Sequence, residues 1–342
     1  MNESLKLDRV LPANGQSTTG TKSAVRSTFT LPQKVFNALF TPMGRKNCYY
    51  SLKKMQISLD PDYRKNGATV YTLNDGHAFV IHRGNRLSET MFLEGAYEPL
   101  ESLIISQAIR DGDMVFDLGA NVGYFTALMD SLVRPYGQVH SFEPAAETFA
   151  RLGETKRLLK LDRSVLHKEA ISDTTGQVDF WVSMDGSDAQ QSTLKNAGLG
   201  DNARYNRVGA TTLDAFIAEM KTGDAEKIAF IKCDIEGAEI TMLKGARNLL
   251  SAANPPMWLI EHNRKVLISH GTSSAELLSY FKSFDVYYVA SVWPPTVMTA
   301  SHATKWSGAP EELPDECNLV ILPRYGAYAK RTAKLRRSGL VV

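Results

Sequence analysis

Short apolar runs alternate with amphipathic helical stretches between about residue 112 and residue 323. Apolar runs bounded by turn residues predict buried strands, and apolar residues spaced three and four apart predict helices. We expect seven strands, at residues 114–118, 139–143, 165–172, 227–234, 257–261, 284–290 and 318–323. One amphipathic helix follows the first strand, and another runs from Gly237 to the stop at Asn254-Pro255-Pro256. This alternation predicts parallel βαβ units and therefore an α/β fold with a doubly wound sheet.

The rest of the chain divides around this main domain, which we place at residues 97–325. Residues 1–30 are rich in Ser and Thr without periodicity, and we expect a disordered lead-in. Residues 31–96 form a small α+β extension, with a β-hairpin over 69–83 that turns at Asn74-Asp75-Gly76. Residues 326–342 form a basic tail. Two long polar connections, 184–209 and 293–316, are expected to shape a ligand site, and the alternative is a pair of surface insertions.

Composition narrows the class of protein. The chain has 342 residues, a formal net charge of +2 and 43% hydrophobic residues, which suits a globular enzyme. Near-neutral charge gives no reason to expect nucleic-acid binding. No apolar stretch is long enough for a transmembrane helix, and the N-terminus lacks the apolar core of a secretory signal. The three cysteines, Cys48, Cys233 and Cys317, form no CxxC pair, so we expect a cytoplasmic protein without disulfides or a thiolate zinc site.

The strongest local motif is the glycine turn Asp117-Leu-Gly119-Ala-Asn121-Val-Gly123, between a strand and a helix. Glycines there allow the backbone to approach a ligand closely. A dinucleotide fingerprint requires G-x-G-x-x-G, whereas this turn has G-x-x-x-G preceded by an acid. A carboxylate in the turn repels a pyrophosphate and attracts a cation. S-adenosylmethionine, with an ammonium, a sulfonium and no phosphate, fits that description.

Glu143 ends the second strand, 26 residues after Asp117. An acid at this place accepts hydrogen bonds from the ribose hydroxyls of a bound nucleoside. The alternative is that Glu143 caps the helix after Pro144. Together with the glycine turn, the nucleoside interpretation is favoured.

A third cluster, Asp234-Ile-Glu236-Gly-Ala-Glu239, lies at the end of the fourth strand. Three carboxylates so close together need solvent, partners or a ligand. We expect Asp234 and Glu236 to serve the reaction and Glu239 to cap the following helix. His262, after the fifth strand, is a candidate general base because its ordinary pKa lies near neutrality. No histidine spacing predicts a tightly held metal, so we expect none. The alternative is a loosely bound Mg²⁺ held by oxygens of Asp234 and Glu236.

The basic tail carries Lys330, Arg331, Lys334, Arg336 and Arg337 without an acid between them. Such a tail is a candidate for contact with an anionic substrate or the surface of a membrane. The alternative is a solvated segment with no partner.

Together these motifs resemble the FkbM family of S-adenosylmethionine-dependent methyltransferases. The matching pieces are VFDLGANVGYFT (115–126), SFEP (141–144), EAISDTTG (169–176), TTLDAF (211–216) and IKCDIEGAEITMLKGA (231–246). The similarity runs from about Tyr97 to Leu322, and D-I-E-G-A-E is its most distinctive part. It implies that residues 97–325 are a class I methyltransferase domain of seven strands, with the last inserted antiparallel between the fifth and sixth.

The resemblance also implies roles for individual residues. Asp117, Gly119, Asn121 and Gly123 would line the methionine and ribose parts of S-adenosylmethionine, and Glu143 would hold the ribose hydroxyls. Ile171 and Ser172 would border the adenine through their backbone, and Glu98 would reach the methionine amine.

Family members generally methylate hydroxyls, so the expected reaction is O-methylation of a sugar, glycoconjugate or other natural product. Alignment supplies most of the acceleration, and a base near the acceptor, from Asp234, His262 or Glu236, adds to it. The alternatives are an N- or carboxyl-methyltransferase with the same cofactor site, a nicotinamide oxidoreductase, and a silent nucleoside-binding scaffold. The sequence leaves the acceptor and the oligomeric state open.

Overall fold

The computed structural model describes residues 42–183, 191–192, 203–221, 223–290 and 302–342. The chain divides into two compact units, Met1–Ser51 and Leu52–Val342. The described part of the first unit belongs to helix α2 (Pro42–Leu59), and the second unit contains all the other described elements. The expected lead-in, residues 1–30, lies outside the described residues.

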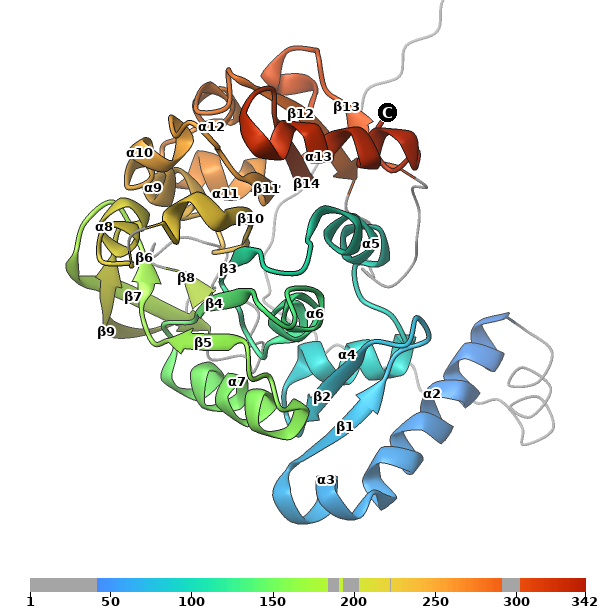
Figure 1. Cartoon of the computed structure of the whole chain (residues 1–342). Helices are drawn as coiled ribbons and strands as arrows, with labels where there is room; N and C mark the ends of the chain where they lie inside the picture. Colours follow the sequence, from blue (N-terminus) through green and yellow to red (C-terminus); the bar gives the residue numbers. More distant parts are fainter. Residues whose placement is uncertain (1–41, 184–190, 193–202, 222, 291–301) are drawn as a thin grey trace, which may run out of the picture. The chain divides into compact units, whose positions relative to one another are not determined.

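A large sheet forms the centre of the second unit. Its strands are β3 (Met114–Leu118), β4 (Gln138–Phe142), β5 (Ser164–His167), β10 (Ile228–Cys233), β11 (Met257–Asn263), β12 (Phe284–Ala290), β13 (Thr304–Lys305) and β14 (Glu316–Pro323). Their order is β13-β12-β14-β11-β10-β3-β4-β5 (Figure 1). Strands β5, β4, β3, β10 and β11 pair in parallel, and β14 lies antiparallel between β11 and β12. The class I methyltransferase order is therefore confirmed, and β13 adds a two-residue edge strand.

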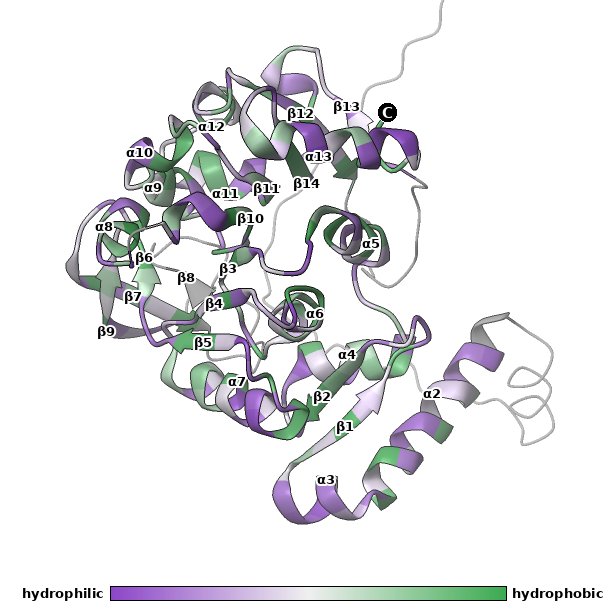
Figure 2. Ribbon diagram, viewed as in Figure 1, coloured by the Kyte–Doolittle hydropathy of each residue, from purple (hydrophilic) through white to green (hydrophobic). Residues whose placement is uncertain are grey.

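Helices cover both faces of this sheet. They are α5 (Pro99–Ala108), α6 (Tyr124–Leu132), α7 (Ala146–Leu159), α8 (Leu213–Ala218), α9 (Glu239–Lys244), α10 (Arg247–Leu250), α11 (Arg264–Ser269), α12 (Ser274–Ser279) and α13 (Gly326–Arg337), with 3-10 turns η1 (Ala225–Lys227) and η2 (Pro310–Glu312). Successive strand side chains point to opposite faces. Val115 and Phe230 pack in one core with residues of α5, α6 and α13, and Phe116 and Ile231 pack in a second core with residues of α8 to α12. Figure 2 shows hydrophobic colouring on α6 and the central strands.

The prediction of one continuous helix from Gly237 to Asn254 is wrong. The segment is two short helices, α9 and α10, that meet at Gly245 and Ala246. A Cβ at Gly245 would lie 2.3 Å from the carbonyl oxygen of Ser172. The interruption therefore lets the chain after the third strand pack against the α9–α10 junction.

The expected third strand, 165–172, is also divided. Its end forms β6 (Ala170–Ile171), which belongs to a second sheet with β7 (Gly176–Ser183), β8 (Gln191–Ser192) and β9 (Ala203–Thr211), in the order β6-β9-β7-β8. Residues 203–209, expected in a long connection, lie in β9, antiparallel to β7. The strand was not predicted because it contains exposed residues such as Arg204 and Tyr205 and therefore forms no apolar run.

The hairpin predicted over 69–83 is confirmed as β1 (Ala68–Thr72) and β2 (Ala78–His82). It lies between helix α3 (Pro61–Asn66) and helix α4 (Arg86–Glu94). Phe79, Ile81 and Met91 share a core cluster with Leu128 and Met129 of α6. This segment is therefore packed as part of the second unit.

The segment expected as a basic tail forms α13. Tyr328, Thr332 and Leu335 are buried, and the Tyr328 hydroxyl donates to the carbonyl oxygen of Glu226 at 2.8 Å. Within the described ranges, no helix combines the length and apolar character needed to cross a bilayer.

Candidate active site

The glycine turn joins the carboxyl ends of three strands. The amide of Gly119 donates to the carbonyl oxygen of Phe142 at 3.1 Å. A Cβ at Gly119 would lie only 1.8 Å from the carbonyl oxygen of Asp234, and the backbone there has φ +79°. Gly123 has φ +91°, and a Cβ on it would lie 2.7 Å from the Leu152 side chain. Both positions therefore require glycine.

Glu143 fixes the turn to the end of β4. Its Oε2 accepts from the Asn121 amide at 3.1 Å, and its Oε1 accepts from the Ala145 amide at 2.9 Å. Burial raises the pKa of Glu143 to about 7, although both amide bonds act in the opposite direction. Each carboxylate oxygen accepts more than one hydrogen bond, so Glu143 keeps capacity for a ligand's hydroxyls.

Asp117 is almost fully enclosed, with 1% of its surface exposed. The Thr126 hydroxyl donates to its Oδ2 at 2.6 Å. Its Oδ1 has no hydrogen-bond partner in the described part of the chain. Burial raises the pKa of Asp117, and Lys232 opposes that shift. A buried carboxylate oxygen without a partner is costly, so this atom is ready to accept a ligand's donor or cation.

Lys232 is a buried cation among these acids. Its Nζ lies 3.0 Å from Oδ2 of Asp234 and 5.0 Å from the centre of the Phe125 ring. Burial disfavours the charge on Lys232, but Asp234, Asp117 and Glu98 together raise its pKa. The ammonium therefore stays charged and offsets part of the negative charge of the site.

A carboxylate cluster lies at the ends of β10 and β11. Asp234, Glu236 and Glu261 are partly exposed, and each offers an oxygen within 4.8 Å of the others. Burial and the neighbouring Asp234 raise the pKa values of Glu236 and Glu261 well above the usual range. Glu236 also has a left-handed backbone, with φ +54°. The cluster can accept a proton, and its geometry could also hold a divalent cation.

Glu239, expected to cap the following helix, instead binds the turn that precedes α9, and the helix itself has no side-chain cap. Glu239 is 3% exposed, and its Oε1 accepts from the amides of Ile235 and Gly237, each at 3.2 Å. It therefore caps the turn that holds Asp234 and Glu236.

His262 lies on the other face of the sheet from the cluster. It is fully buried near Ile260, with Nε2 2.8 Å from the Ser274 hydroxyl and Nδ1 3.6 Å from the Cys317 sulfur. Burial lowers the pKa of His262 to about 4. The structure does not bring this residue to Asp234 and Glu236.

Comparison with known proteins agrees with this geometry. A family model described as the Methyltransferase FkbM domain matches residues 117–285. Over 210 residues the chain is 39% identical to 31-O-demethyl-FK506 methyltransferase FkbM of Streptomyces tacrolimicus, covering 54% of this chain and 74% of that protein. The chain belongs to the FkbM family of methyltransferases.

Two other relatives extend the comparison. The present chain is 29% identical over 185 residues to 2-O-methyltransferase NoeI of Sinorhizobium fredii, covering 50% of this chain and 74% of that protein. It is 25% identical over 158 residues to hexuronic acid methyltransferase AglP of Haloferax volcanii, covering 44% of this chain and 57% of that protein. The nicotinamide oxidoreductase alternative no longer applies, because the enzyme is an S-adenosylmethionine-dependent methyltransferase.

The residues of the candidate site fit S-adenosylmethionine. The cofactor carries a sulfonium and an ammonium. The site has more acids than cations, and one Asp117 oxygen lacks a partner among the described residues. The structure brings together Asp117, Gly119, Asn121, Gly123 and Glu143, all selected from the sequence. Ile171 pairs with Thr211 of β9, and the Ser172 amide donates to the Thr211 carbonyl oxygen at 2.9 Å. The Ser172 carbonyl oxygen lies against Gly245 at the α9–α10 junction.

Sequence reasoning assigned no role to Lys232 or Glu261. The register pairs Lys232 with both Asp117 and Leu259, so these side chains share one face, and Glu261 follows Leu259 by two positions. Glu98, a weaker expectation, is in electrostatic contact with Lys232 and Asp234, and burial raises its pKa to about 8. Strand alternation would have found Glu261 once the register was known.

Proposed function

We propose that this enzyme methylates a hydroxyl group of a sugar or another natural product. The observation that carries the proposal is the Asp234, Glu236 and Glu261 cluster beside the glycine turn. Two relatives support it through their names, which specify 2-O- and 31-O-methylation. The acceptor would lie over this cluster, at the carboxyl ends of β10 and β11.

Asp117, Asn121 and Glu143 would hold the cofactor, with Gly119 and Gly123 shaping the turn. Glu143 would accept from the ribose hydroxyls, and the free Oδ1 of Asp117 would face the methionine part. Ile171 and Ser172 would border the adenine. The cofactor supplies an electrophilic methyl group when bound.

Glu236 would act as the general base for the acceptor hydroxyl. A carboxylate with a raised pKa is a stronger base than an ordinary one at neutral pH. Asp234, fixed by Lys232, would orient the hydroxyl, and burial together with the charges of Asp234 and Glu239 would keep the proton affinity of Glu236 high. His262 is left out of this proposal because both of its ring nitrogens face partners in the opposite core.

Carboxyl methylation is the second candidate, because the name of the hexuronic acid relative does not specify the atom methylated. An anionic carboxylate acceptor would have to approach Asp234, Glu236 and Glu261, and like charges repel. A neutral hydroxyl meets no such repulsion. The charge of the site therefore favours the hydroxyl.

The test is methyl transfer to sugars, uronic acids and natural-product alcohols with isotopically labelled cofactor. We expect a product stable to mild alkali, as an ether is, and a base-labile product would indicate a methyl ester. Glu236→Gln should keep cofactor binding by calorimetry and lose about 10²-fold or more in turnover. Glu147→Gln, which removes the same charge from an exposed position of α7, is the matched control. Full turnover in Glu236→Gln would contradict the assignment of the base.

A further inference from the structure

Helix α13 presents three cations on its outer side. Lys330, Lys334 and Arg337 are spaced by four and three residues, so they project from the same side of the helix. All three are exposed, whereas Leu335 and Tyr328 are buried on the opposite side. Much of α13 has hydrophilic colouring in Figure 2. We call Lys330, Lys334 and Arg337 the α13 basic face.

The two remaining cations of the helix hold it in place. Arg331 donates to Oδ1 of Asp113 at 2.7 Å, and Arg336 donates to Oδ2 of Asp285 at 2.7 Å. Among the described residues, the three cations of the basic face form no ion pair. Their charges therefore face solvent.

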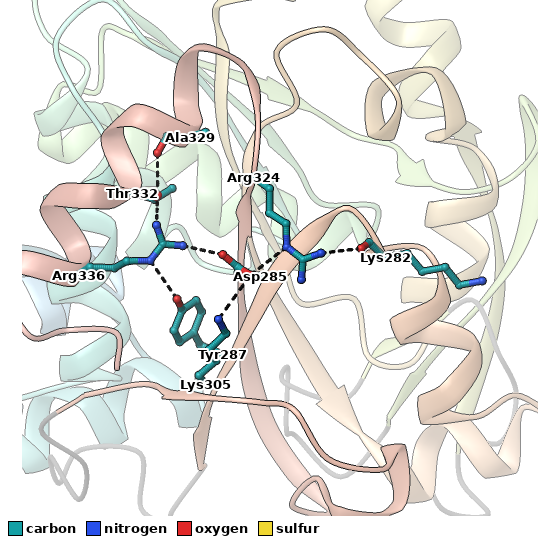
Figure 3. A network of polar contacts seen from close by, with 8 residues as sticks. All are labelled: Lys282, Asp285, Tyr287, Lys305, Arg324, Ala329, Thr332 and Arg336. Atoms are coloured by element: carbon teal, nitrogen blue, oxygen red, sulfur yellow. Dashed lines mark hydrogen bonds and ion pairs between the residues drawn. The ribbon is translucent and has the colours of Figure 1, made fainter.

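The neighbouring surface adds to the positive charge. A single carboxylate, Asp285, is shared by Arg336, Arg324 at 2.9 Å and Lys305 at 3.7 Å (Figure 3). Arg324 also donates to the carbonyl oxygen of Lys282 at 3.1 Å. One anion among three cations leaves an excess of positive charge beside the α13 basic face.

This surface is separate from the candidate active site. Asp285 stands at the amino end of β12, and Asp113 directly precedes β3, whereas the glycine turn and the carboxylate cluster lie at the carboxyl ends of the strands. An acceptor held at the cluster is therefore not the group that the basic face would bind. A partner docked on α13 would leave the cluster accessible.

We propose that the α13 basic face docks on the surface of an anionic lipid bilayer. A row of long, flexible cations on the outer side of a helix matches a flat array of phosphate headgroups. Cations near such a surface contribute to binding roughly additively and are screened by salt. The face offers no aromatic side chain between its cations for stacking on nucleic-acid bases.

The test is sedimentation of the full chain with phosphatidylcholine vesicles, with and without phosphatidylglycerol. We expect binding only to the anionic vesicles, weakening as salt is added. The variant Lys330→Gln/Lys334→Gln/Arg337→Gln should bind about 10²-fold more weakly, since each cation contributes roughly fivefold. The variant should keep wild-type methyl transfer to a soluble acceptor, because none of the three residues lies in the candidate site.

The matched control is Lys54→Gln/Lys65→Gln/Lys221→Gln, which removes the same charge from exposed positions elsewhere. It should bind anionic vesicles as the wild type does. Equal binding by the α13 variant and the wild type, or equal weakening in both triple variants, would overturn the proposal. So would the absence of binding to anionic vesicles at low salt, or equally tight binding of a DNA duplex.

Discussion

The ammonium of Lys232 lies 3.0 Å from Oδ2 of Asp234, two residues further along the chain. Lys232 is the last but one residue of β10, and Asp234 follows the strand, so both side chains point to the same face. The same ammonium is in electrostatic contact with Asp117 of the glycine turn. One buried cation thus links the cofactor turn to the carboxylate cluster.

Replacing Lys232 by Met should destabilise the protein and reduce catalysis together. The change leaves buried Asp117 without a counter-charge, and removing one partner of a buried pair costs about 3–5 kcal/mol. The charge of Lys232 lowers the pKa of Glu236, so its loss should raise that pKa further and move the acidic limb of the pH–rate profile to higher pH. Urea denaturation and turnover across pH measure the two effects.

Lys232→Arg is the control for charge. It should restore more of the pH profile than Lys232→Met, although the larger guanidinium disturbs packing against Phe125. A Lys232→Met variant of unchanged stability and unchanged pH profile would show that the ion pair serves neither purpose.

Gly119→Ala should abolish cofactor binding. The new Cβ would lie 1.8 Å from the Asp234 carbonyl oxygen, so β3 and β10 would have to separate at their ends. We expect a loss of more than about 3 kcal/mol of stability. Gly153→Ala, in α7 with no atom within 4 Å of the new Cβ, should instead stabilise by about 0.5–1 kcal/mol. Calorimetric titration and thermal unfolding of both variants test the contrast.

The sheet could be predicted from the sequence because its strands are short apolar runs separated by clear turn residues. Strand β9 could not, because its side chains are largely polar and its partner β7 is itself amphipathic. The division of the helix after Gly237 was also hidden. It depends on the close approach of Ser172 to Gly245, which are 73 residues apart in the sequence.

The glycine turn and Glu143 were predictable because a local motif carries them. The choice between Glu261 and His262 was not, because β11 is apolar on both faces and its alternation gives no sign of which face bears the site. Only the strand register, which pairs Lys232 with Leu259, shows which face bears the site, and this register is a property of the folded sheet.

Glu143 should make the stability of the cofactor-free protein fall as pH rises. Its pKa is about 7 in the folded chain against an ordinary value of 4.5, so the folded state binds the proton more tightly. The stabilisation that Glu143 contributes is fully present below pH 4.5. It is lost as the pH rises from 4.5 to about 7, by about 3 kcal/mol in total.

Comparison of wild type with Glu143→Gln isolates this contribution from other titrating groups. The difference in unfolding free energy should move in favour of the variant between about pH 4.5 and about pH 7. Glu147→Gln, at an exposed position of α7, controls for the loss of one negative charge. A difference that does not vary with pH would mean that Glu143 is not held in a charge-disfavouring environment.

His262→Ala should act on stability and spare the chemistry. The change removes a fully buried ring and its contact with Ser274, which should cost about 2–4 kcal/mol. Turnover per folded molecule should stay within about twofold of wild type, with the same pH profile. A fall in turnover of about 10²-fold in a folded variant would instead indicate that His262 acts as a general base.

Removal of divalent cations should leave methyl transfer unchanged. Asp234, Glu236 and Glu261 are close enough to hold a cation, but the Lys232 ammonium already neutralises part of their charge. A general base is sufficient to activate the hydroxyl, because the sulfonium methyl is already electrophilic. We expect equal turnover before and after dialysis against EDTA, with added Mg²⁺ giving no increase. The cluster would instead be a metal site if the wild type lost turnover on dialysis and regained it with Mg²⁺, while the turnover of Glu261→Gln did not respond to Mg²⁺.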